Sequence, residues 1–274
     1  MNTSSGLKVL LLGGTRDAIN IANALLELNK SGEHEIELIY SVAGIVRQPS
    51  VNCTIHKGGF SQYAVPLNSD HLGTANNKSQ QGMKHFLQQH DIEYVIDATH
   101  PYALTMSTTA SIVCESLTLP LLTFCRPQWQ PMKNDNWITV NNWSEAKVAM
   151  HPFSRPFVTI GRIAVSEVNS IPGHQFWTIR SAIEDNEILD RYRLIKDIGP
   201  FEEAHEKTLM QTNNIDVVVC KNSGGSSVDG KLKAARALQL PVIMLNRPKY
   251  HHAYGEYYNH ESDLISALIN RNNH

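Results

Sequence analysis

Short, almost purely apolar runs alternate with helix-like segments along this chain, and the alternation constrains the fold more than any other feature. Runs of this kind are typical of parallel strands that helices cover on both faces. Strands are predicted at residues 8–12, 36–40, 94–97, 121–124, 138–140, 157–160, 177–180, 215–220 and 242–245. Between the first two, Ile19, Ala22 and Leu25 recur at helical spacing, as expected of a crossover helix. The sequence therefore predicts an α/β protein.

The two halves of the chain resemble each other in three ordered places. The pairs are VLLLGGTR at 9–16 with FVTIGR at 157–162, IEYVIDATH at 92–100 with IDVVVCKNS at 215–223, and LPLLTFCRP at 119–127 with LPVIMLNRP at 240–248. Chance convergence on strand-like sequence is the alternative to a duplication. We interpret the pairs as two Rossmann-like parallel-sheet domains, residues 1–130 and 131–274, with the boundary in the stretch 127–136. A ligand cleft is expected between the two domains.

Two segments fall outside this repeat. Residues 63–81 are polar and rich in turn formers, and they predict an exposed loop insertion. Residues 261–269 have helical spacing, and we expect this helix to dock on the second domain.

Composition excludes several classes of protein. The 274 residues include 24 basic and 26 acidic side chains, a net charge of −2, so neither a nucleic-acid nor a membrane partner is expected. No run approaches the ~18 apolar residues of a membrane span, and no signal peptide is recognisable, so we expect a cytoplasmic protein. The cysteines are scattered and lack metal-ligand spacing, so reduced thiols and no metal site are expected at Cys53, Cys114, Cys125 and Cys220. The oligomeric state is left open.

A pair of glycines ends the first predicted strand. Gly13 and Gly14 come at the strand end, and Thr15 and Arg16 begin the following helix. Free backbone N–H groups and the helix dipole attract phosphate at such a place. The spacing departs from GxGxxG, so a tight turn without a ligand is the alternative.

The end of the second predicted strand bears on coenzyme choice. NAD-selective folds usually carry a carboxylate there. Here Ser41 and Arg47 follow the strand instead, which favours a 2′-phosphate and hence NADP. A solvated surface charge at Arg47 is the alternative.

Polar residues also follow other predicted strands, at the edge where open α/β sheets bind their ligands. Arg126 and Arg247 each follow a strand and precede a proline, and paired arginines suit carboxylates or phosphates. The other residues of this kind are Thr99, His100, Tyr102, Lys221 and Ser223. Capping or structural duty is the alternative for the histidine.

One catalytic pattern is rejected. Tyr192 and Lys196 have the spacing of the Tyr-xxx-Lys pair of short-chain dehydrogenases, whose members share a helix face. Here the two residues are expected to share a strand face, far in sequence from the glycine pair.

Nine segments together resemble the precorrin-6A reductase family of cobalamin biosynthesis, over about residues 8–248. They are LLLGGTRDA, SVAGIVRQP, GGF, IDATHPYA, LPLLTFCRPQW, VTIGR, GPFEE, VVVCKNSGG and AARALQLPVIMLNRP. IDATHPYA and KNSGG are far more specific than the glycine turn. The resemblance implies NAD(P)H-dependent reduction of the macrocycle, with hydride added to C19 and a proton to C18 to give precorrin-6B. It also implies two Rossmann-like domains with coenzyme and tetrapyrrole meeting between them.

The resemblance also implies roles for individual residues. It puts the Gly13–Arg16 turn at the coenzyme phosphates, and it puts Ser41, Ala43 and Gly44 near the adenosine. The complete set of coenzyme candidates is Gly13, Gly14, Thr15, Arg16, Ser41, Ala43, Gly44, Arg47, Gly59, Phe60 and Thr99. NADPH is the expected coenzyme, with NADH open because Ile45 stands where the family usually has an arginine.

Substrate contacts are expected from local cations, because the macrocycle carries acetate and propionate carboxylates. The candidates are His100, Tyr102, Arg126, Arg162, Lys221, Ser223 and Arg247, with the first two as positioning residues. No catalytic residue or proton donor is assigned. Another NADP-linked reductase on the same scaffold and a non-enzymatic NADPH sensor are the alternatives, and the cations argue against the sensor.

Overall fold

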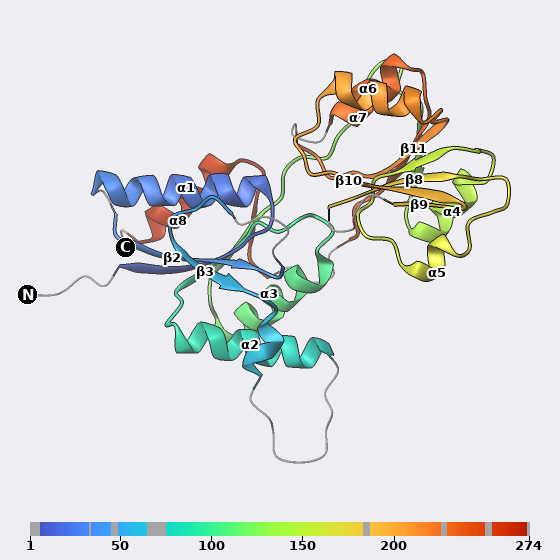
Figure 1. Ribbon diagram of the computed structural model, residues 1–274. Coiled ribbons are helices and arrows are strands. Elements are labelled where there is room, and N and C mark those ends of the chain that lie inside the picture. Colours follow the sequence, from blue (N-terminus) through green and yellow to red (C-terminus); the bar gives the residue numbers. More distant parts are fainter. Residues whose placement is uncertain are drawn as a thin grey trace, which may run out of the picture. The chain divides into compact units, whose positions relative to one another are not determined.

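The computed structural model describes residues 6–32, 34–44, 49–64, 75–182, 187–225, 229–249 and 254–272. The chain divides into two compact units, each built around its own sheet (Figure 1). Unit 1 comprises Met1–Arg126 together with Lys249–His274, and unit 2 is Pro127–Pro248. The predicted α/β class with two Rossmann-like domains is confirmed.

Unit 1 is a three-layer sandwich around a six-stranded parallel sheet in the order β13-β5-β4-β1-β2-β3. Its strands are β1 (Leu7–Leu12), β2 (Ile36–Val42), β3 (Thr54–Lys57), β4 (Tyr94–Asp97), β5 (Leu121–Phe124) and β13 (Glu256–Tyr258). The helices α1 (Arg16–Ser31) and α8 (Glu261–Asn272) cover one face, and α2 (Ala75–Gln89) and α3 (Leu104–Leu117) cover the other (Figure 1). A short 3₁₀ turn, η1 (Phe60–Tyr63), packs beside α2.

The first crossover helix begins and ends for identifiable local reasons. Thr15 caps α1, because its Oγ1 accepts a hydrogen bond from the N–H of Ala18 at 3.0 Å. Gly32 ends the helix in the left-handed region at φ 74°. Ile21 and Leu25 are fully buried against the sheet. The helix start is therefore fixed directly after the glycine turn.

Unit 2 repeats the sandwich with a seven-stranded sheet in the order β6-β12-β11-β7-β8-β10-β9. Its strands are β6 (Trp137–Val140), β7 (Pro156–Val158), β8 (Trp177–Ser181), β9 (Glu187–Leu189), β10 (Tyr192–Lys196), β11 (Val217–Lys221) and β12 (Val242–Leu245). Among the described strands of this sheet, the edge strand β9 alone runs antiparallel. The helices are α4 (Trp143–Met150) and α5 (Val165–Val168) on one face, and α6 (Glu203–Thr212) and α7 (Gly230–Ala237) on the other.

The strand order supports the duplication. The three echoing sequence pairs are β1 with β7, β4 with β11, and β5 with β12, and they hold equivalent places in the orders β5-β4-β1-β2 and β12-β11-β7-β8. The strand next to β5 is β13, and the strand next to β12 is β6, although β6 follows β5 in sequence. Measured by the repeat, the strand that follows β5 thus joins the sheet of the second repeat, and the strand that follows β12 joins the sheet of the first.

The predicted place of the C-terminal segment is wrong. Residues 249–274 belong to unit 1, because β13 pairs with β5 and α8 packs on α1 through the fully buried Leu264 and Leu268. The expected helix is present, but it docks on the first unit. β13 is three residues long, two of them exposed and one half-buried, so no apolar run predicts it.

The predicted loop at 63–81 is also partly wrong. Residues 75–81 form the first turns of α2, while residues 65–74 lie outside the described residues. The buried side chains Met83, Phe86 and Leu87 all lie in the second half of this helix. Its solvated first half therefore shows no apolar period.

Along the described chain, no helix is both long and apolar enough to cross a membrane. The rejected Tyr192 and Lys196 pair lies on strand β10, as expected, and not on a helix.

Candidate functional site

The glycine turn of unit 1 connects β1 to α1 at the carboxyl edge of the sheet. The N–H of Gly13 donates to the carbonyl of Ser41 at 2.8 Å, which joins the turn to the end of β2. Gly14 has φ 105°, a value that favours glycine. Thr15 donates its hydroxyl hydrogen to the carbonyl of Ala98 at 2.8 Å and so joins the turn to the end of β4. Three strand ends therefore meet at the start of α1, where backbone N–H groups are free of helical partners.

Gly13 is required by close packing. The ring of Tyr40 lies against it, and an added Cβ would lie 2.7 Å from Cε1 of that ring and closer still to Cζ. Gly14 is different, because no described atom lies within 4 Å of an added Cβ. The backbone of Gly14 is therefore open to an approaching ligand.

At the end of β2, the predicted coenzyme residues divide into buried and exposed ones. Ser41 is buried, and its Oγ lies 2.8 Å from Nδ1 of His56. Ala43 and Gly44 are exposed directly beyond the strand. Ile45 and Arg47 lie outside the described residues. Among the described residues of this segment, the small residues Ala43 and Gly44 are thus presented at the surface.

The ring of His56 organises the turn that follows β3. Its Nε2 lies 3.1 Å from Nε2 of Gln62, and its ring stacks on Phe60 at 4.9 Å between centroids. Burial lowers the pKa of His56, and the nearby His90 lowers it further. Phe60 is fully buried, whereas Gly59 beside it is exposed, and coenzyme binding by these two residues stays a prediction. The phenylalanine belongs to the core.

The IDATHPYA segment forms a tight turn between β4 and α3. The buried Asp97 accepts hydrogen bonds from the backbone N–H and the hydroxyl of Thr99, at 3.0 and 2.7 Å. Nδ1 of His100 accepts from the N–H of Tyr102 at 3.2 Å, and the two rings lie 5.6 Å apart. The carbonyl of Ala98 is the one that Thr15 binds. The structure therefore brings the predicted Thr99, His100 and Tyr102 beside the glycine turn.

Arg126 follows β5 at the same edge of unit 1. Its guanidinium donates to Oδ2 of Asp17, in the first turn of α1, at 2.6 Å. Both side chains are largely buried, at 11 % and 21 % exposure. The sequence predicts a substrate-binding cation, but this guanidinium already holds a carboxylate of its own chain.

Arg247 is likewise engaged within unit 2. Its Nε donates to the carbonyl of Asn222 at 2.9 Å, and its Nη2 donates to that of Ser223 at 3.0 Å. Trp129 completes the support, because its Nε1 donates to the carbonyl of Gly225 at 2.9 Å. Both predicted substrate cations thus hold groups of their own chain, and their contact with substrate stays a prediction. Arg247 holds the turn after β11, and Ser223 is buried within that turn.

Two other predicted cations lie at the carboxyl edge of the unit 2 sheet. Lys221 ends β11, and burial lowers the pKa of its ammonium group. Arg162 is exposed shortly after the neighbouring strand β7, behind Gly161 at φ 91°. Adjacent parallel strands place these two residues on one edge.

Sequence reasoning missed a buried charged cluster in unit 2. Arg180 makes two hydrogen bonds to the fully buried Glu206, at 2.6 and 3.1 Å, and its guanidinium lies 4.0 Å from the ring centroid of Phe201. Lys231, at the start of α7, is 6 % exposed with its Nζ 5.4 Å from the ring centroid of Trp129. Arg180 ends a predicted strand, and Glu206 and Lys231 lie near other charged residues, so no sequence pattern marks the three as buried partners.

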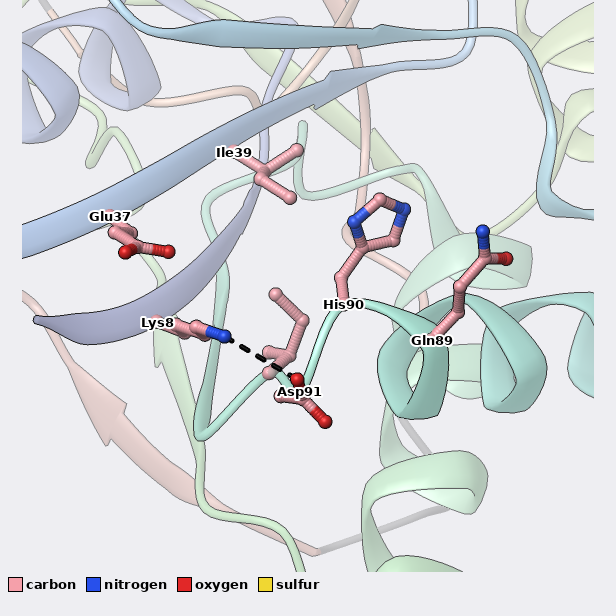
Figure 2. A pocket seen from close by; sticks show the side chains of 7 residues that line it. Lys8, Glu37, Ile39, Gln89, His90 and Asp91 are labelled. Carbon is pink, nitrogen blue, oxygen red and sulfur yellow. Dashed lines mark hydrogen bonds and ion pairs between the residues drawn. The ribbon is translucent and has the colours of Figure 1, made fainter. Parts of the chain in front are cut away.

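A hollow of about 230 Å³ in unit 1 lies away from this edge (Figure 2). Lys8 at the start of β1 and Glu37 at the start of β2 line it, and Lys8 reaches Asp91 at 3.4 Å. Because these residues begin their strands, the hollow is at the amino edge of the sheet, opposite the glycine turn. Among the described residues, no group of three or more His, Cys, Asp or Glu could hold a metal ion.

Two helix-covered parallel sheets with polar turns at their carboxyl edges define a two-unit, Rossmann-like α/β protein. The precorrin-6x reductase CbiJ/CobK family model matches residues 8–268, and the chain belongs to this family. It is 32 % identical to a precorrin-6A reductase of Rhodococcus erythropolis over 245 residues, 88 % of this chain and 89 % of the relative. It is 26 % identical to a cobalt-precorrin-6A reductase of Methanocaldococcus jannaschii, covering 89 % and 91 %.

A solved structure agrees with the fold. The chain superposes on a CobK precorrin-6A reductase with a TM-score of 0.79 and 26 % identity, covering 96 % of this chain and 97 % of the other. The family predicted from sequence is confirmed.

Proposed function

We propose that this chain catalyses the reduction of precorrin-6A to precorrin-6B in cobalamin biosynthesis. The observation that carries the proposal is the family match over residues 8–268, supported by the 32 % identity to the Rhodococcus erythropolis precorrin-6A reductase. The reaction adds a hydride to C19 and a proton to C18 of the macrocycle. The chain must therefore have one site for a reductant and another for a substrate with several carboxylates.

We assign the reductant as NADPH, which supplies a hydride from C4 of its nicotinamide. The open backbone at Gly14 fits a ligand that approaches the glycine turn closely. The N–H groups of Thr15 and Arg16, in the unpaired first turn of α1, would donate to the phosphates. Ala43 and Gly44, exposed beyond β2, would lie along the adenosine.

NADPH rather than NADH is proposed because the residues ending β2 carry no acid. Ser41-Val42-Ala43-Gly44 has no carboxylate to accept hydrogen bonds from a ribose diol. Arg47 is three residues further along the sequence and is the proposed partner of a 2′-phosphate.

The substrate carboxylates are assigned to the edge of unit 2. Arg162 and Lys221 follow adjacent strands, and a guanidinium and an ammonium group both bind carboxylates. Arg247 would act through the backbone by holding the turn after Lys221. His100 and Tyr102, beside the glycine turn, would position the ligands of unit 1 without acting as a proton donor. The meeting of coenzyme and substrate in a cleft stays a prediction.

The test is an anaerobic assay with purified protein, precorrin-6A and either NADPH or NADH. We expect absorbance at 340 nm to fall with NADPH, at the same rate as the precorrin-6A spectrum disappears. NADPH binding without oxidation would favour the sensor. NADPH oxidation with another substrate but not with precorrin-6A would favour a different reductase. A higher kcat/KM with NADH would contradict the coenzyme assignment.

A further inference from the structure

We propose that Tyr40 is a positioning residue that holds the glycine turn in the shape that binds coenzyme. The inference rests on the proposed function, because it concerns the same coenzyme site. Tyr40 acts through the backbone of the turn and not by touching the reacting atoms.

The strand register brings this tyrosine to the turn. Tyr40 in β2 pairs with Leu11 in β1, two residues before Gly13. Its side chain lies on the sheet face that α1 covers, and it is 1 % exposed. The ring therefore reaches the turn from beneath, through the core of the unit.

Two contacts fix the turn against this ring. The first is steric, because the ring fills the space that a side chain at Gly13 would need. The second is polar, because the N–H of Gly14 donates to the Tyr40 hydroxyl oxygen at 3.1 Å. Gly14 is the residue at φ 105°, so this hydrogen bond holds the turn where its backbone is least usual. Burial raises the pKa of Tyr40, which keeps the hydroxyl neutral.

This arrangement divides the donors of the turn into two groups. The N–H of Gly14 is directed at a side chain of the core, whereas the first N–H groups of α1 have no helical partners. The coenzyme phosphate would therefore be received by the helix end, and the turn before it would be held ready by Tyr40. A site already in its bound shape loses less entropy on binding, which strengthens affinity.

A role for Tyr40 in blocking the site predicts the opposite change in NADPH affinity. If the hydroxyl merely occupied a donor that phosphate needs, removing the hydroxyl would free the N–H of Gly14 and tighten binding. Positioning predicts weaker binding on removal.

The experiment compares Tyr40→Phe with Tyr258→Phe. The control loses a tyrosine hydroxyl in the same unit. This hydroxyl donates a hydrogen bond to Glu256 at 2.6 Å and is not part of the glycine turn. NADPH affinity is measured by fluorescence titration, and kinetics with precorrin-6A give KM and kcat. For Tyr40→Phe we expect the Kd and KM of NADPH to rise about tenfold, the loss of one buried hydrogen bond. The kcat should stay within about twofold and the KM of precorrin-6A should not change. The control should match the wild type.

A second variant tests the coupling within the turn. Gly14→Ala strains the backbone at φ 105° and should also weaken NADPH binding. Because both variants disturb one structure, the double variant should lose less than the sum of the two effects on free energy. Additive losses contradict the proposal, as does unchanged or tighter NADPH binding by Tyr40→Phe. If wild-type protein binds neither NADPH nor NADH, the proposed function itself is overturned.

Discussion

The two predicted substrate arginines at the carboxyl edges of the sheets contact groups of their own chain. Arg126 and Arg247 look like a matched pair in sequence, yet one holds Asp17 and the other holds two backbone carbonyls. A guanidinium with several fixed donors suits either duty, so sequence position alone does not separate them. Lys221 and Arg162, at the carboxyl edge of the unit 2 sheet, are further candidates for substrate carboxylates.

Replacing Lys221 tests its assignment to the substrate site. Lys221→Met keeps the aliphatic stem but removes the charge, so the KM of precorrin-6A should rise about tenfold or more, as for one charge-assisted hydrogen bond. The Kd of NADPH should stay unchanged. Lys207→Met, at an exposed position of α6, is the matched control and should behave as wild type. An unchanged KM removes Lys221 from the substrate site.

His56 should make stability depend on pH. Because burial lowers its pKa in the folded state, the unfolded chain binds more protons below about pH 6.5. The free energy of unfolding should therefore fall as the pH drops through that value toward the lower folded pKa. Urea unfolding at several pH values should show a weaker dependence in His56→Gln. His205→Gln, on the exposed side of α6, should keep the wild-type dependence, and an equal slope in all three proteins contradicts the assignment.

Secondary-structure elements were predictable where they are buried. Each predicted apolar run is a strand in the structure, because central parallel strands are covered on both faces. The unpredicted strands are β3, β9 and β13, and the two whose burial is described are mixed or mostly exposed. Such strands form by pairing with a neighbour, which no local pattern records. The glycine turn and the helix cap at Thr15 could be recognised from a few adjacent residues. The support by Tyr40 could not, because it depends on which residues of β1 and β2 pair.

Arg180 of β8 and Glu206 of α6 form a buried ion pair. Glu206→Gln removes the negative charge nearest to the buried Arg180, and among the described residues the longer ion pair to Asp197 at 3.6 Å is left. The free energy of unfolding should therefore fall by about 3 kcal/mol. The control Glu27→Gln removes an exposed pair with Lys30 and should cost less than about 1 kcal/mol. Denaturant unfolding of both variants is the measurement, and equal losses would contradict the buried role.

The whole molecule is divided differently from its sequence halves. Unit 1 needs the C-terminal segment, because β13 extends its sheet and α8 covers α1 with Leu264 and Leu268. Unit 2 is one continuous segment, Pro127–Pro248. The repeat in sequence predicted two domains correctly, but it could not show that their edge strands are exchanged, because equivalent strands fit either sheet.

Fragments test this division. Residues 127–248 alone should unfold cooperatively in a thermal melt. Residues 1–130 alone should not, since each buried leucine that α8 supplies contributes about 2–5 kcal/mol. Joining residues 249–274 to the fragment 1–130 through a short linker should restore a cooperative transition. A stable fragment 1–130 would contradict the assignment of α8 to unit 1.

The reaction proposed for this chain transfers a hydride directly from the coenzyme to the macrocycle. The most direct measurement is anaerobic turnover of precorrin-6A with NADPH that carries deuterium at both C4 positions, followed by mass spectrometry and NMR of the product. We expect one deuterium in the product, located at C19. Reduced product without deuterium, or NADPH that binds but leaves precorrin-6A unreduced, would contradict it.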